Sequence, residues 1–248
     1  MNRANANLFR AGFTLIEIMV AMVVLAILVV MVGNIFQQVS DSWNIGTQSS
    51  EANTAGRAAM NYMAQELAQA VAGPIEAAPG ITPCPPLKFK VIDDNANGDE
   101  IRFVSFTGEP NADDNRRALR GGIFLLEKTG GFQHTLRYCR LTGINPYSSA
   151  MDSWTYQGIE NIISNVVDFQ VFVYSNRTDF TNATGAIPYG DFTNELPACV
   201  DLYLEILSEG DMRRWESPGV AKDDFRDRNV MCYSTRVFFL NRKGYAAR

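Results

Sequence analysis

The chain has 248 residues, a net charge of −5 and a single histidine. This acidic balance excludes a general nucleic-acid or anionic-membrane binder, because both need basic stripes. The length and the many aromatic and β-branched residues exclude a disordered chain and are enough to bury a core.

The chain opens with a short basic leader and a long apolar run. Arg3 and Arg10 precede the run, and no Lys or Arg follows before Arg57. Phe13–Val32 is 20 residues long, which is enough for a helix to span about 30 Å of hydrocarbon. The basic residues before the run place the N-terminus in the cytoplasm and the later residues across the membrane. We therefore expect a single-pass membrane protein.

Glu17 is the one charged residue inside this run. A charge at the centre of a membrane helix costs about 2.5–3.5 kcal/mol on insertion scales, so its presence calls for a role. The segment Gly12-Phe13-Thr14-Leu15-Ile16-Glu17 resembles the class III signal of type IV prepilins and type II secretion pseudopilins. The resemblance implies cleavage after Gly12 by a prepilin peptidase and N-methylation of Phe13. It also implies that Glu17 meets the charged N-terminus of a neighbouring subunit during assembly.

A single long helix is predicted from Phe13 to Val71. Its second half carries Met60, Met63 and Leu67 at helical spacing, which favours docking on a sheet. Gly73-Pro74 is a helix stop. The predicted organisation is a leader (1–12), a transmembrane or filament-core helix (13–33), an amphipathic second half (34–72), a linker (73–86) and a globular domain (87–248).

The globular domain reads as a set of strands separated by polar loops. The runs rich in Val, Ile, Phe and Tyr are Leu87–Ile92, Glu100–Phe106, Gly122–Lys128, Phe132–Leu141, Val166–Tyr174, Cys199–Leu207 and Tyr233–Asn241. Ser175–Pro197 and Ser208–Met231 read as polar loops. The predicted fold class is α+β, a long N-terminal helix packed on a mostly antiparallel sheet. This is also the pilin-like plan that the resemblance implies.

Four cysteines, Cys84, Cys139, Cys199 and Cys232, follow the apolar run. An even number in an oxidising compartment predicts up to two disulfides, with three pairings open. Buried free thiols are the alternative. The spacings match no zinc template.

Asp93, Asn95 and Asn97, with Asp99 nearby, match the opening of a calcium loop, but the Glu that should close it is replaced by Val104. A plain turn explains the same residues, because Asn and Asp bond their own backbone. We favour the turn and expect no cofactor, with calcium as the alternative.

Two other groups of residues are candidates for binding. Arg213–Glu216 and Asp223–Arg228 read as mixed-charge loops that are either solvated or form a contact surface for other subunits. His134 lacks a Ser or Cys pattern around it that would indicate a catalytic triad. The sequence contains neither a Gly-rich phosphate loop nor the HExxH or GxSxG motif, so we expect no enzyme.

The resemblance implies a minor pseudopilin or minor pilin in the bacterial inner membrane, with its C-terminal domain periplasmic or extracellular, and in a filament after assembly. Asp99–Ser105, Leu196–Leu202 and Thr235–Arg242 look like stretches of the larger J or W type subunits. The implied partners are a prepilin peptidase, other pilin or pseudopilin subunits, an assembly platform protein and membrane lipid. One alternative is a minor pilin that binds a ligand or DNA, with Arg116, Arg117 and Arg120 as its basic patch. Another is a membrane-anchored periplasmic protein that uses the same signal.

Overall fold

The computed structural model describes residues 14–72, 88–92, 99–110, 117–128, 134–141, 158–174, 190–193, 196–219 and 221–239. Helix α1 spans Leu15–Ala68, close to the predicted Phe13–Val71. It passes through Gly33 and Gly46 without interruption, although each glycine weakens a helix interior by about 1 kcal/mol relative to Ala. The chain divides into two compact units, Met1–Thr47 and Gln48–Arg248.

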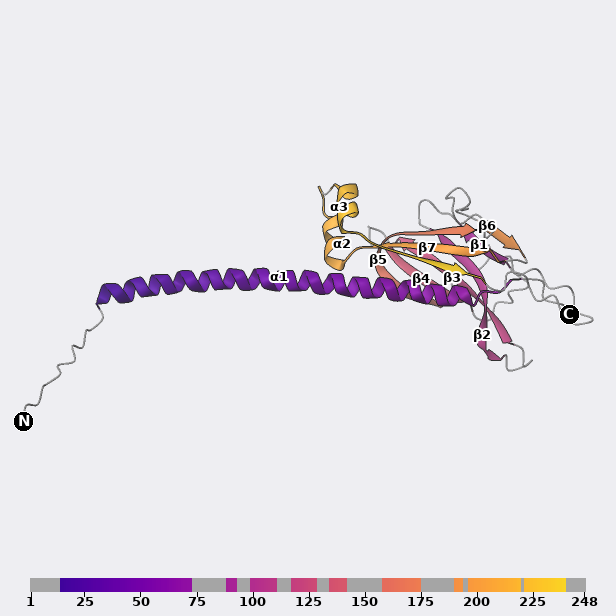
Figure 1. The fold of residues 1–248 in the computed structure, drawn as a ribbon, viewed down its shortest axis with the longest axis horizontal. Helices are drawn as coiled ribbons and strands as arrows, with labels where there is room; N and C mark the ends of the chain where they lie inside the picture. The colour runs from indigo at the N-terminus through magenta and orange to yellow at the C-terminus, as the bar shows by residue number, and fades with distance from the viewer. Residues whose placement is uncertain are drawn as a thin grey trace, which may run out of the picture. The chain divides into compact units, whose positions relative to one another are not determined.

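The second unit contains an eight-stranded sheet in the order β6-β1-β2-β3-β4-β5-β7-β8. Every pairing is antiparallel. The strands, most of them labelled in Figure 1, are β1 (Lys88–Ile92), β2 (Glu100–Pro110), β3 (Arg117–Lys128), β4 (His134–Leu141), β5 (Ile159–Tyr174), β6 (Gly190–Thr193), β7 (Cys199–Ile206) and β8 (Met231–Phe238).

Residues 48–68 of α1 pack on one face of this sheet. Met60, Met63 and Leu67 recur at helical spacing and are buried in the core. They share it with inward-facing residues of the strands, among them Phe103, Phe124, Leu136, Tyr138, Phe169, Val200, Leu202 and Leu204. The predicted α+β class, a long N-terminal helix packed on an antiparallel sheet, is confirmed.

The sheet curls, so that its first strands come close to its later ones. The ring of Phe89 in β1 lies 5.5 Å from that of Phe239, which directly follows β8. Asp99, just before β2, donates its backbone N–H to the carbonyl of Phe169 in β5 at 3.2 Å. Its carboxylate accepts from the backbone N–H of Val171 at 2.6 Å. Residues far apart in strand order therefore share one core.

Each predicted strand is present, but several ends differ. β5 begins at Ile159 rather than Val166, because its first residues pair with β4, where Ile159 lies opposite Cys139. β3 begins at Arg117 rather than Gly122, because this part pairs with the extended end of β2. The predicted linker 73–86 and the turn residues 93–98 lie outside the described residues.

Both predicted polar loops contain regular structure, which corrects that prediction. The first contains β6, which pairs with β1. The second contains helices α2 (Glu209–Glu216) and α3 (Lys222–Asn229). The side chain of Ser208 caps α2 by accepting from the backbone N–H of Asp211. Met212 and Trp215 are buried with Leu207 in a small separate core, on which Phe225 packs. The two helices form because this core covers their apolar residues.

Candidate functional site

The first turn of α1 is closed by reciprocal hydrogen bonds between Thr14 and Glu17. The Oε2 atom of Glu17 accepts from the backbone N–H and from the hydroxyl of Thr14, both at 3.0 Å. In return, the backbone N–H of Glu17 donates to the Thr14 Oγ1 at 3.4 Å. With Thr14 directly before the helix, this is a capping box. Its T-x-x-E spacing was readable in the sequence, and it gives Thr14 a role that the sequence analysis missed.

The capping box leaves part of the Glu17 carboxylate available. Both bonds that the carboxylate accepts end on Oε2, and within the described residues no hydrogen bond ends on Oε1. A carboxylate oxygen accepts more than one donor. Glu17 can therefore cap its own helix and still accept a donor from outside. Gly12 and Phe13 lie outside the described residues, so cleavage and methylation there stay predictions.

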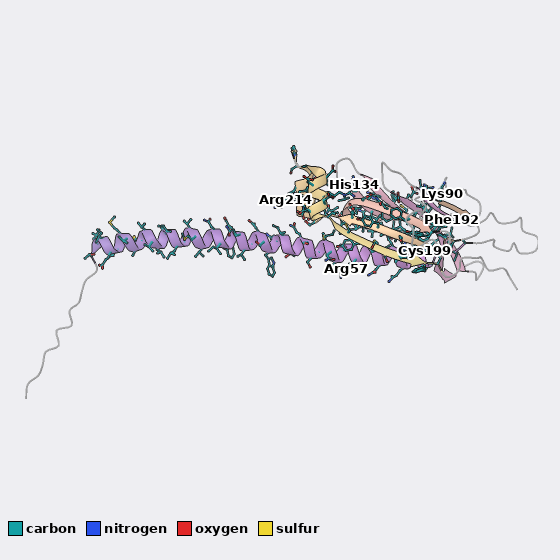
Figure 2. All side chains as sticks on the ribbon, turned by 45° about the horizontal axis from the view of Figure 1, so that its top comes forward. Arg57, Lys90, His134, Phe192, Cys199 and Arg214 are labelled. Atoms are coloured by element: carbon teal, nitrogen blue, oxygen red, sulfur yellow. The ribbon has the colours of Figure 1, made fainter. Side chains whose placement is uncertain are left out.

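The apolar run that follows is uncovered on every side. Leu15, Val20, Leu25 and Val30 are between 58% and 77% exposed, and side chains stand out along both sides of the N-terminal part of α1 in Figure 2. Within the described residues, α1 is the one helix long and apolar enough to cross a membrane. A soluble helix normally keeps one polar face. This stretch has none between Ile18 and Val32.

A polar cluster fixes the C-terminal part of α1 to the sheet. The Glu66 Oε2 accepts from the Arg120 guanidinium at 2.5 Å and from the Tyr138 hydroxyl at 3.0 Å. Glu66 and Tyr138 are buried. Burial, and then the Glu66 charge, raise the pKa of the Tyr138 phenol above its usual value. Arg120 also donates to the Ser105 Oγ at 3.2 Å. The cluster thus joins α1 to β2, β3 and β4.

This cluster changes the interpretation of the predicted basic patch. Arg120 forms an ion pair with Glu66, so its charge is largely compensated inside the protein. Arg116 lies outside the described residues, and nothing is described of the Arg117 side chain. The arginine offered for a DNA-binding patch is therefore part of the helix–sheet contact.

The strand positions of Cys139, Cys199 and Cys232 reduce the number of disulfides that the chain can form. On the neighbouring strands β7 and β8, Cys199 lies opposite Phe238 whereas Cys232 lies opposite Glu205. Six positions along a strand are about 20 Å, and a disulfide needs Cα atoms within about 7 Å. Cys139 lies opposite Ile159 at the far end of β5 from Tyr174, the partner of Cys199. Cys139 in β4 is separated from Cys232 in β8 by both β5 and β7. All three described cysteines are free, and because none of them lies near another, the chain cannot form two intramolecular disulfides. A bridge to Cys84, outside the described residues, stays a prediction.

The three described cysteines also differ in environment. Cys139 and Cys199 are buried, whereas Cys232 is exposed on β8. Burial raises the pKa of the Cys139 thiol to about 11. Because the thiolate is the reactive form, Cys139 is a poor nucleophile at neutral pH.

The described residues give no support to the predicted calcium loop. Asp93, Asn95 and Asn97 lie outside them. Asp99 is buried and uses a carboxylate oxygen to accept from the Val171 N–H. The described residues hold no group of three or more His, Cys, Asp or Glu side chains that could bind a metal ion. Calcium binding stays a prediction, and Asp99 has a structural role.

The histidine and the two mixed-charge segments that the sequence offered as candidates lie in regular secondary structure. His134 begins β4 and is buried. Trp215 belongs to the small core of α2 and α3, so it is not an exposed anchor for a partner. Arg213 pairs with Glu209 on the outside of α2. Arg214 is exposed on α2, as Figure 2 shows.

Comparison with known proteins identifies a family motif in the N-terminal segment. The family described as "Prokaryotic N-terminal methylation motif" matches residues 9–33. No curated protein matches the chain in sequence. Among solved structures, a type IV-like pilin from Thermus thermophilus is similar, with a TM-score of 0.40 and 11% identity over 77% of this chain and 98% of that one. The prepilin-type N-terminal methylation signal predicted from the sequence is thus confirmed in residues 9–33.

Proposed function

We propose that the chain is a minor pseudopilin or minor pilin, a structural subunit of a type II secretion pseudopilus or a type IV pilus-like filament. The observation that carries the proposal is the methylation motif at residues 9–33 on a helix whose apolar residues are exposed. Such a surface needs lipid or other helices around it. A subunit that moves from the membrane into a filament uses both in turn.

In this mechanism a prepilin peptidase cuts after Gly12 and the new amino group of Phe13 is methylated. An assembly platform protein and its ATPase then extract the subunit, and neighbouring apolar helices replace the lipid around residues 13–33. Oε1 of Glu17 accepts from the Phe13 ammonium of a neighbour while Oε2 keeps the helix capped. A buried carboxylate is tolerated when a fixed cation offsets its desolvation.

The orientation and the subunit type are part of the same proposal. Arg3 and Arg10 hold the N-terminus in the cytoplasm, so that residues 34–248 are exported. The chain length and the large sheet favour a larger minor subunit of J or W type over a short major one. The sheet then lies on the filament surface, where it meets cargo or outer components.

Mass spectrometry of the mature N-terminus tests the proposal. We expect a first peptide that begins with methylated Phe13. Replacing Gly12 by Leu should leave the precursor uncut in the membrane, because the peptidase must fit a small residue beside the cut. The matched control is Ala11→Leu, one residue further from the bond. A wild-type protein that begins at Met1, or is cleaved beyond Val32, contradicts the proposal.

A further inference from the structure

The covered face of α1 continues one turn beyond the main core. From Leu67 back to Ala52, its buried and half-buried residues recur every three or four positions, and Ala52 packs against the core that α1 shares with the sheet. Four residues before Ala52, Gln48 is half-buried. Every other described residue from Thr14 to Glu51 is exposed. Gln48 is therefore the first covered residue of α1, and it is not part of the hydrophobic core.

The first turn of α2 covers Gln48. Gly210 lies in this turn, and a Cβ at position 210 would lie 2.7 Å from the Gln48 Oε1 and 3.8 Å from its Cδ. Real Cβ atoms essentially never come within 3.0 Å of another heavy atom. Because glycine has no side chain, the Gln48 amide can lie directly against the backbone of α2. The contact can be followed in Figure 1, where α2 lies beside α1.

The α2–α3 pair has a core of its own. Met212 and Trp215 are buried in a small cluster that is separate from the main core. Arg226 of α3 joins the pair to the sheet, because its Nε donates to the Glu205 Oε2 at 2.7 Å and its guanidinium lies 3.5 Å from the Asp168 carboxylate. Parts of a domain with few buried contacts of their own open locally at a lower free energy than the main core. The pair therefore has the means to open while the sheet stays folded.

We infer that the α2–α3 pair is a conformational device that covers the turn of α1 at residues 48–51 and uncovers it by opening separately from the main core. With the pair closed, the domain holds α1 from Gln48. With the pair open, the domain holds α1 from Ala52, which still packs on the main core. Opening thus releases one further turn of α1, or about 6 Å of helix, to new surroundings. The point at which α1 leaves its domain is set by α2 rather than by the sheet.

Thiol labelling of the full-length chain in detergent tests this. Gln48→Cys places a thiol under α2, and Ser49→Cys places one on the exposed side of the same turn. Each is labelled with iodoacetamide and identified by its own peptide, which separates it from the native cysteines. We expect the Gln48→Cys thiol to react several-fold more slowly than the Ser49→Cys thiol. Adding Met212→Ala opens a cavity in the small core and should bring the two rates together.

The matched control is Arg213→Ala, which removes an exposed side chain from the outside of α2 and should leave the slow rate unchanged. Hydrogen exchange in the same samples reports the state of each part, through peptides that cover α2 and peptides that cover residues 60–68 of α1. With Met212→Ala, the α2 peptides should exchange faster and the α1 peptides should not.

Three results would overturn the inference. The first is equal labelling of the Gln48→Cys and Ser49→Cys thiols in the otherwise wild-type chain. The second is slow labelling of the Gln48→Cys thiol that persists when Met212→Ala has opened α2. The third is loss of protection at residues 60–68 together with α2, because the pair then does not open separately from the main core.

Discussion

The two ends of α1 use the same residue types in opposite environments. Leu25 is 60% exposed, whereas Leu67 is fully buried. Met31 is 56% exposed, whereas Met63 is fully buried. Residues 48–68 obtain their cover from the sheet of the same chain. Residues 15–47 have apolar side chains for which the surroundings must supply the cover. Residue type alone does not distinguish the exposed half of α1 from the buried half. The two halves differ in whether the sheet packs against their apolar side chains.

The largest expected effect is at the cluster that fixes α1 to the sheet. Glu66→Ala leaves Arg120 without its main ion-pair partner in a mostly buried position. Breaking such a pair typically costs about 3–5 kcal/mol in the free energy of unfolding. Urea unfolding of the second unit (Gln48–Arg248), followed by circular dichroism, measures it.

Glu209→Ala is the matched control. It removes the partner of Arg213 from an ion pair in which both side chains are more than half exposed. Exposed pairs contribute about 0–1 kcal/mol. Equal losses in the two variants would show that the Glu66 cluster does not hold the helix on the sheet.

A leucine pair compares the two ends of α1 directly. Leu67→Ala opens a cavity in the core and should lower the free energy of unfolding of the second unit (Gln48–Arg248) by about 2–5 kcal/mol. Leu25→Ala removes the same atoms from an exposed position and should leave that free energy unchanged. The same urea titration measures both. A substantial loss with Leu25→Ala would mean that the N-terminal run is covered by its own domain.

A smaller effect distinguishes two glycines of the same helix. A Cβ at position 56 would lie 2.6 Å from the Tyr233 ring and 2.9 Å from the Ile206 side chain. Gly56→Ala should therefore destabilise the domain, by about 1–3 kcal/mol. A Cβ at position 46 meets nothing within 4 Å. Gly46→Ala should thus stabilise the helix by about 0.5–1 kcal/mol.

Thermal unfolding by circular dichroism checks the two signs. A domain that tolerates Gly56→Ala without loss would show that Tyr233 and Ile206 can move aside, and that the helix is less tightly docked than the core suggests.

The sequence predicted the parts of the fold that depend on local pattern. The ends of α1, its buried Met stripe and the central strands follow from periodicity and from the Gly-Pro stop. α2 and α3 were missed because a buried pair, Met212 and Trp215, rather than a local apolar pattern, holds them. β6 has only four residues and is defined by its pairing with β1.

In the candidate site, too, the sequence predicted what depends on local pattern and missed what depends on contacts between distant residues. The Gly12, Phe13 and Glu17 candidates came from one contiguous motif. The role of Arg120 could not be read, because its partner Glu66 lies 54 residues away in the chain. Thr14 is the intermediate case, since its capping spacing was present in the sequence and was not interpreted.

The most direct test of the proposed function separates the helix-capping role of Glu17 from the role in assembly that we propose for its charge. Glu17→Gln keeps a side chain that can complete the capping box but removes the charge. Thr14→Val removes the hydroxyl of the cap and keeps the charge. The measurement is the amount of each variant in sheared filaments, at matched membrane levels and with the mature N-terminus verified.

If Glu17 pairs with the Phe13 ammonium of a neighbour, Glu17→Gln should be incorporated at least about a hundredfold less than wild type, because breaking a buried charge pair costs about 3–5 kcal/mol. Thr14→Val should be incorporated almost normally. Normal incorporation of Glu17→Gln, together with a loss in Thr14→Val, would contradict the charge-pairing role and reduce Glu17 to a helix cap.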